Sequence, residues 1–205
     1  PRRFGKSLFL STLKAYFEGK KECFEGLFLE KWEEAQAAQE GREAWQQYPV
    51  LYLDLNAKNY ESRENLENVL DRHLSIWENK YGVKEKRVDL EDRFQSLLRY
   101  IYETTHQQVI VLVDEYDKPL LESIHNPELY ETFRSMLYSI YANIKGCDKY
   151  LRFVFLTGVS RFGKLTIFSG LNSLKDITIE ARYSSICGVT ETELVENFSS
   201  ELDAL

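Results

Sequence analysis

The stretch Val109–Glu115, with the sequence VIVLVDE, is a run of five aliphatic residues that ends in two adjacent carboxylates. Such an apolar run is typical of a strand that is buried on both faces of a parallel sheet. Helical patterns precede it at Leu90–Thr105 and follow it from Asn126 onward. Strands that alternate with helices predict an α/β fold, a three-layer, mostly parallel sheet with helices on both faces. Because ligands in such sheets bind at the carboxyl ends of strands, Asp114 and Glu115 are candidate site residues.

Near the start of the chain, the turn Arg3-Phe4-Gly5-Lys6-Ser7 leads directly into a stretch with helical spacing. A Gly-Lys-Ser turn at the start of a helix directs backbone N–H groups and a lysine ammonium toward phosphate oxygens, and its hydroxyl reaches a Mg²⁺ ion. The complete motif has another glycine further upstream, at a position that would precede the first residue of this sequence. By itself the turn is therefore equally consistent with a solvated loop.

The turn and the acidic strand together predict a site for a nucleoside triphosphate. In phosphate-loop folds the loop comes first in the chain and the acidic strand later, which is the order here. We expect Lys6 and Ser7 to meet the carboxyl end of the strand. There Asp114 would hold the Mg²⁺ ion through water and Glu115 would polarise an attacking water molecule. Adjacent Asp and Glu residues further suggest the subclass of phosphate-loop proteins that has an additional strand and a catalytic glutamate.

A second stretch, Gly158–Lys164 with the sequence GVSRFGK, also fits the G-x-x-x-x-G-K pattern and follows an apolar strand. Its next residue is Leu165, which has no hydroxyl for a metal ion, and Thr166 comes one position late. The residues after it contain no long apolar strand that ends in an acid. We therefore interpret Thr157–Lys164 as the end of a later strand with its loop, and not as the phosphate loop.

Composition limits the remaining functional classes. The chain has 205 residues, 43% of them hydrophobic, which suffices for one substantial domain with its own core. A net charge of −7 argues against a general nucleic-acid surface. Three scattered cysteines without C-x-x-C spacing favour a reducing cytoplasm over a zinc site or a disulfide framework. The three isolated histidines are interpreted as packing or surface residues. The sequence shows neither a membrane-spanning apolar stretch nor a signal peptide.

The spacing of apolar residues predicts the other elements and a single domain over residues 1–205. The chain starts inside a motif, so we expect a fragment whose first strand precedes Pro1. Asp54 ends a predicted strand and is a further site candidate, although a turn acid is the more common role. Ile177–Ile179 is a candidate short fourth strand. The remaining predicted elements are helices at Ser7–Glu18, Trp32–Trp45, Glu64–Tyr81, Asn126–Gly146 and after the cap Thr190–Glu193, and strands at Pro49–Leu55 and Phe153–Thr157.

The sequence resembles the AAA-ATPase-like family of bacterial proteins over essentially its whole length. The motifs that carry the resemblance are PRRFGKS (Pro1–Ser7), VLVDEYDKPL (Val111–Leu120), FVFLTGV (Phe153–Val159) and IFSGLN (Ile167–Asn172). In that family the loop reads RPRRFGKS, so the absent upstream glycine is a family trait. Family members commonly have KFSK where this chain has Arg161–Lys164, which supports excluding the second tetrad. Many members continue into a PD-(D/E)-x-K nuclease-like domain. Nothing in this sequence corresponds to it, so if the protein has such a domain it lies beyond Leu205, and a nucleic-acid partner would bind there.

The resemblance implies a site for ATP and Mg²⁺ and assigns roles to its residues. Thr157 and Ser160 are candidates for sensing the γ-phosphate. Arg161 would contact the γ-phosphate or a neighbouring subunit, although an exposed loop arginine is the more common role. Asp117 and Lys118 are either site residues or a structural ion pair. The implied residues are Arg3, Phe4, Gly5, Lys6, Ser7 and Thr157 for the nucleotide, Ser7 and Asp114 for the metal, and Glu115 for catalysis.

The implied function is Mg²⁺-dependent binding and hydrolysis of ATP, coupled to a conformational switch. Two alternatives stay open. One is an ATP-binding interaction module with negligible hydrolysis, and the other is a phosphate-loop kinase. Glu115 argues against the kinase, because a carboxylate at that position suits the activation of water. The sequence leaves the oligomeric state open.

Overall fold

Among the residues that the structure describes, three parallel strands form the sheet, in the spatial order β1 (Val50–Asp54), β2 (Val109–Asp114) and β3 (Leu151–Leu156). In the register, Asp54 lies beside Asp114, and Val113 lies beside Leu156. This computed structural model describes residues 4–56, 59–84, 87–159 and 174–202. The predicted site residues Arg3, Ser160 and Arg161 lie outside these ranges, as does the rest of the second tetrad.

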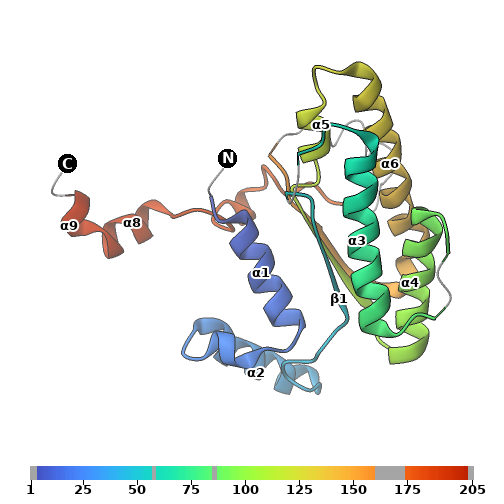
Figure 1. The fold of residues 1–205 in the computed structure, drawn as a ribbon. Helices are drawn as coiled ribbons and strands as arrows, with labels where there is room; N and C mark the ends of the chain where they lie inside the picture. Colours follow the sequence, from blue (N-terminus) through green and yellow to red (C-terminus); the bar gives the residue numbers. More distant parts are fainter. Residues whose placement is uncertain (1–3, 57–58, 85–86, 160–173, 203–205) are drawn as a thin grey trace.

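Helices cover both faces of the sheet, as the sequence predicted (Figure 1). Helix α1 (Lys6–Phe17) packs on one face, whereas α3 (Arg63–Tyr81), α4 (Leu90–Thr105) and α6 (Pro127–Gly146) pack on the other. The α/β architecture is thereby confirmed. The shorter elements are η1 (Lys21–Phe24), α2 (Phe28–Glu40), α5 (Lys118–Glu122), η2 (Asp148–Tyr150), η3 (Ala181–Tyr183), α8 (Glu191–Asn197) and α9 (Ser199–Leu202).

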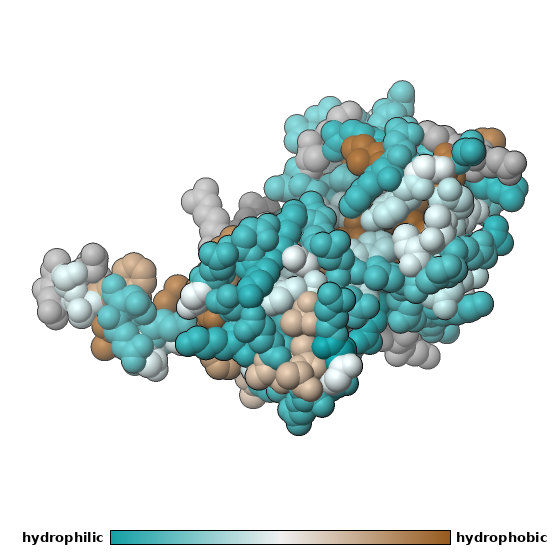
Figure 2. Space-filling model, turned by 90° about the horizontal axis from the view of Figure 1, so that it is seen from below, coloured by the Kyte–Doolittle hydropathy of each residue, from teal (hydrophilic) through white to brown (hydrophobic). Residues whose placement is uncertain are grey.

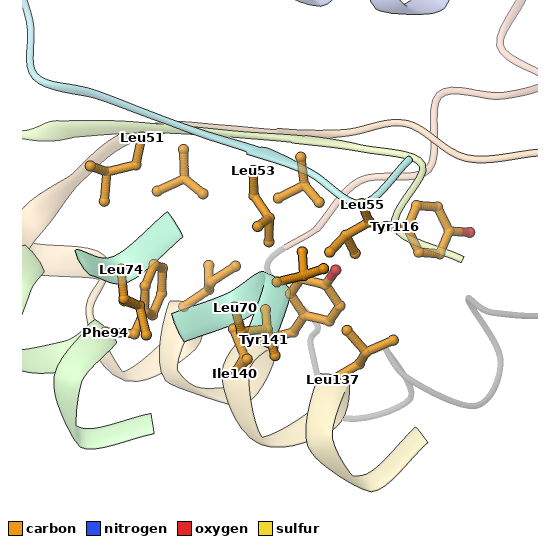
Figure 3. Close-up of a cluster of buried hydrophobic side chains, with 14 of the residues drawn as sticks. Leu51, Leu53, Leu55, Leu70, Leu74, Phe94, Tyr116, Leu137, Ile140 and Tyr141 are labelled. Carbon is orange, nitrogen blue, oxygen red and sulfur yellow. The ribbon is translucent and has the colours of Figure 1, made fainter. Parts of the chain in front are cut away.

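The central strand β2 is buried along its entire length, and its side chains alternate between two apolar layers. Val111 and Val113 face the α3, α4 and α6 layer, whereas Ile110 and Leu112 face α1. Figure 3 shows the larger layer, in which Leu51 and Leu53 of β1 point toward side chains of α3 and α6. A fully buried aliphatic side chain contributes about 1.5–3 kcal/mol, so these two layers fix the register of the strands.

Local capping signals in the sequence position two of the helices. The Asn126 side chain accepts a hydrogen bond of 3.2 Å from the Leu129 N–H, and Pro127 begins α6, as predicted. Thr190 and Glu193 form the reciprocal capping box of α8.

Two predicted elements differ from the structure. The helix expected at Trp32–Trp45 is α2, which begins at Phe28 and ends before Gly41, because Gly41 adopts a left-handed backbone with φ of 63°. The strand proposed at Ile177–Ile179 is a turn. The Thr178 N–H donates to the Asp176 carboxylate over 2.9 Å, and Lys175 pairs with Glu180 at 2.8 Å, so local polar contacts close this segment.

Residues 174–202 form an arm that extends away from the sheet on the side of α1 (Figure 1). Hydrophobic side chains gather along this arm where it stands out from the body (Figure 2). Its exposed apolar residues are Ile179, Val189, Leu194, Val195, Phe198 and Leu202. Within the described ranges, no helix combines the length and apolarity that crossing a membrane requires.

Candidate functional site

The alternation of side chains along β2 directs Asp114 toward α1. Residues 110, 112 and 114 share one face of the strand, and Ile110 and Leu112 pack with Leu10 of α1. The Asp114 side chain therefore lies on the sheet face that α1 covers, at the carboxyl end of the central strand. It is buried, with 3% of its surface exposed.

Both carboxylate oxygens of Asp114 accept a hydrogen bond from a neighbouring strand. The Thr157 hydroxyl, directly after β3, donates to Oδ1 over 2.6 Å. The Tyr52 hydroxyl, on β1, donates to Oδ2 over 3.4 Å. Burial raises the pKa of Tyr52, and the charge of Asp114 raises it further. The two donors hold the carboxylate in one orientation across three strands. Tyr52 was not among the residues predicted from the sequence.

The predicted phosphate-binding turn forms the start of α1. Gly5 is the N-cap residue and has φ of 82°, a left-handed conformation that glycine adopts without strain. Phe9 N–H donates to Gly5 O over 2.8 Å, which closes the first helical turn. The first N–H groups of a helix have no intrahelical acceptor, so they and the helix dipole favour an anion at this end. Ser7 and Phe4 are exposed beside it.

Glu115 is the second carboxylate of the acidic strand end. It follows β2 directly, and its φ of 53° is left-handed, which is unusual for a residue with a side chain. Burial raises the pKa of Glu115, and the neighbouring charge of Asp114 raises it further, whereas Lys6 lowers it. The end of α1 lies beside the start of β1, where Tyr48 N–H donates to Phe17 O over 2.7 Å, so the turn at the start of α1 lies toward the carboxyl ends of the strands. A carboxylate with a raised pKa in a strained backbone is typical of functional sites.

A second contact fixes the loop after β3 to the loop after β2. Asp117 is fully buried, and both of its carboxylate oxygens lie 3.1 Å from the Val159 N–H. Tyr116 N–H donates to Thr157 O over 2.9 Å. Gly158 allows this close approach, because a Cβ atom there would lie 2.5 Å from the Tyr116 ring. Asp117 thus positions the segment that carries Thr157.

Lys118 contacts the loop after β1. Its ammonium donates to Asn56 O over 3.1 Å and to Asn56 Oδ1 over 3.0 Å, and it lies 3.5 Å from Glu122. Asp54 accepts a hydrogen bond of 2.8 Å from Asn56 N–H. This is the contact of a turn acid, the more common of the two roles that the sequence suggested for Asp54. The contacts of Lys118 thus join the loop after β1 to α5, which follows β2.

The described side chains fit a Mg²⁺ ion that is bound mainly through a substrate. No group of three or more His, Cys, Asp or Glu residues within the described ranges could hold a metal ion. Mg²⁺ commonly uses one or two protein ligands and completes its coordination with water and phosphate oxygens. Ser7 and Asp114 supply this kind of donor set. The three cysteines are free.

Comparison with known proteins agrees with these features. A family model described as "Predicted AAA-ATPase", the AAA-ATPase-like family, matches residues 1–168. A protein of Azotobacter chroococcum mcd 1, described as an uncharacterized protein in the vnfD 5′ region, is 38% identical over 207 residues. That alignment covers 100% of this chain and 38% of the relative, so the chain spans about two fifths of the relative's length. No solved structure gives a significant match. The chain belongs to the AAA-ATPase-like family.

Proposed function

We propose that the protein binds ATP with Mg²⁺ at the start of α1 and hydrolyses it. One observation carries this proposal: α1 packs on the sheet face that Asp114 shares, and its last residue, Phe17, accepts a hydrogen bond of 2.7 Å from Tyr48 N–H just before β1. The first turn of α1 therefore lies toward the carboxyl ends of the strands. A helix start with a lysine and an exposed serine, and a strand end with a buried aspartate and a glutamate, thus belong to the same end of the sheet, which supports the proposal. This is the combination that phosphoryl transfer to water requires.

In this proposal each residue near the phosphates has a separate role. Gly5 and the following N–H groups bind the β-phosphate, and Lys6 bridges the β and γ oxygens. Ser7 and Asp114 hold Mg²⁺, which neutralises charge on the phosphates when it is bound. Thr157 keeps the Asp114 carboxylate oriented, and it is the proposed sensor of the γ-phosphate.

Glu115 is the proposed catalytic residue. Its carboxylate accepts a proton from the water molecule that attacks the γ-phosphorus. The bond between that phosphorus and the β,γ-bridging oxygen breaks, and the products are ADP and inorganic phosphate. Burial raises the pKa of Glu115, which makes it a stronger base than an exposed glutamate.

Nucleotide binding is tested by thermal denaturation of the full-length protein with ATP and Mg²⁺. A ligand at about a hundred times its Kd stabilises the folded state by about 2.7 kcal/mol. We expect this shift in the wild type and its loss in Lys6→Ala. Lys164→Ala is the matched control, because it removes the lysine of the second RFGK tetrad and should leave the shift intact. A shift that survives Lys6→Ala and disappears in Lys164→Ala would reverse the assignment.

A nucleotide-gated switch with negligible hydrolysis is the second candidate. It is favoured by the hydrogen bonds that already engage both carboxylate oxygens of Asp114. A nucleotide that changed these hydrogen bonds would move the loops after β2 and β3, which the contact between Asp117 and Val159 joins. Measured turnover separates the candidates, because a switch would show the thermal shift without catalytic hydrolysis.

A further inference from the structure

A groove of about 520 Å³ lies where α3, α4 and α6 meet. These helices pack side by side on the sheet face opposite α1 (Figure 1). The groove is lined by the first half of α3, the start of α4 and the middle of α6. None of the proposed nucleotide-site residues lines it, so it is a separate surface.

The floor of the groove is apolar and continuous with the core. Leu70 and Ile140 belong to the main hydrophobic cluster, and the half-buried Leu90 and Met136 pack against that cluster. Val88 lies at the groove with 93% of its surface exposed. An apolar floor with an exposed aliphatic residue beside it favours the burial of apolar side chains from a ligand.

The walls are strongly acidic. The lining residues include five carboxylates, Glu67, Asp71, Asp89, Glu91 and Asp92, and two guanidinium groups, Arg63 and Arg93. Arg63 pairs with Glu67 at 2.7 Å, and Arg93 pairs with Asp71 at 2.5 Å. Arg93 also pairs with Glu78 at 2.8 Å, so its single charge is shared between two carboxylates, and an excess of negative charge remains at Asp71 of α3 and at the start of α4.

Helix capping explains only part of this charge. Acidic residues in the first turn of α4 are favoured by the helix dipole. However, Asp89 is the N-cap residue and its side chain makes no capping hydrogen bond. Glu67 and Asp71 come from the body of α3. The acidic side chains therefore converge on the groove from two helices.

Arg93 holds the groove in a fixed shape. Its guanidinium is buried and donates to Glu78 through Nε and Nη2, each over 2.8 Å, and to Ser75 over 3.1 Å. These bonds join α4 to α3. A groove that is formed before binding loses less entropy when a ligand enters.

We propose that this groove binds a cationic amphipathic segment of a protein partner, with apolar side chains on the floor and Lys or Arg side chains against the acidic walls. Helices of this kind commonly bind in apolar grooves, and opposite charges select the partner. The end of the chain's own arm does not fit by charge, because residues 190–202 contain neither Lys nor Arg but four glutamates, Glu191, Glu193, Glu196 and Glu201. Nucleic acid and anionic membranes are excluded as ligands of the groove, because their negative charge would face its acidic walls.

The binding test uses the full-length protein and a fluorescent peptide of about 15 residues, with Leu on one helical face and Lys beside it. A second peptide has Glu at every Lys position. We expect saturable binding of the Lys peptide, weakened by added salt, and far weaker binding of the Glu peptide. Equal binding of both peptides, or no saturable binding of the Lys peptide up to about 1 mM, would overturn the proposal.

Matched protein variants locate the binding. The groove variant is Asp89→Asn, Glu91→Gln and Asp92→Asn, which keeps side-chain shape and retains a good N-cap residue. The control variant is Glu22→Gln, Glu25→Gln and Glu43→Gln, three exposed residues that do not line the groove. We expect the groove variant to bind the Lys peptide about tenfold more weakly and the control to bind it like the wild type. Equal weakening in both variants would contradict a specific groove.

Two further variants test the floor and the independence of the site. Met136→Gln places an amide on the apolar floor and should weaken binding even at high salt, because it removes apolar contact. Lys6→Ala, in the proposed phosphate-binding turn, should bind the Lys peptide normally. Wild-type affinity in Met136→Gln would show that the peptide binds by charge alone and would reject the groove.

Discussion

The Thr157 hydroxyl donates a hydrogen bond of 2.6 Å to Asp114 Oδ1, and both side chains are buried. This bond joins the end of the central strand to the residue after β3, which lies 43 positions later in the chain. A buried carboxylate needs such donors, because an ionised group without them is strongly unfavourable away from water. The same bond orients the oxygen atoms that the proposed Mg²⁺ site uses.

Replacing Thr157 with Val should therefore affect stability and nucleotide binding together. Val has nearly the same shape but has no hydroxyl, so one oxygen of Asp114 loses its donor. We expect a loss of about 1–3 kcal/mol in the free energy of unfolding, measured by urea denaturation, and weaker Mg²⁺-dependent binding of ATP. Thr157→Ser keeps the hydroxyl and should retain most of both. If Thr157→Val matched Thr157→Ser, the hydrogen bond would have no role in the site.

Gly158 should tolerate no side chain. A Cβ atom at this position would lie 2.5 Å from the Tyr116 ring and 2.6 Å from the Asp117 carboxylate. Gly158→Ala should lower the melting temperature and displace the loop that Asp117 holds. Gly146→Ala is the matched control, because a Cβ atom there meets open space at the end of α6. That variant should be as stable as the wild type or more so, by up to about 1 kcal/mol.

The charge of Glu115 should destabilise the folded protein at neutral pH. Because the fold raises the pKa of Glu115, the folded state binds a proton more readily than the unfolded chain. Glu115 therefore lowers the free energy of unfolding when the pH is above its folded-state pKa. This loss of stability disappears as the pH falls below the unfolded-state pKa of about 4.3. Glu115→Gln should melt at a higher temperature than the wild type at pH 7, with the difference vanishing near pH 4.

The control for that pH series is Glu25→Gln, which changes an exposed glutamate. It should leave the melting temperature nearly unchanged across the same range. A Glu115→Gln variant that was less stable than the wild type at pH 7 would show that the Glu115 carboxylate makes a favourable ionic contact in the folded protein.

The sequence was informative wherever one local pattern decided the outcome. Five aliphatic residues predicted β2, and the cap at Asn126 predicted the start of α6. The side of the sheet that Asp114 faces also follows from its spacing to Leu112. The strand predicted at Ile177–Ile179 was wrong. Polar contacts of the flanking Asp176 and Lys175 close this segment as a turn, and the spacing of its apolar residues does not indicate these contacts.

Features that depend on strand register or on helix packing could not be predicted from the sequence. The contacts of Tyr52 and Thr157 with Asp114 require the alignment of three strands, which no local pattern specifies. The left-handed backbone at Glu115 has no sequence signal, because glycine and asparagine are the residues that usually indicate it. The acidic groove depends on how α3, α4 and α6 pack together.

The proposed hydrolysis is tested most directly by the steady-state rate of ATP turnover in Glu115→Gln and in the wild type, with ATP affinity measured on the same samples. Gln keeps the shape of the side chain but cannot accept the proton of the attacking water. A general base commonly contributes about 10²–10⁴-fold to the rate. We predict turnover reduced by about that factor with ATP affinity nearly unchanged. Equal turnover in the two proteins would contradict the catalytic role of Glu115.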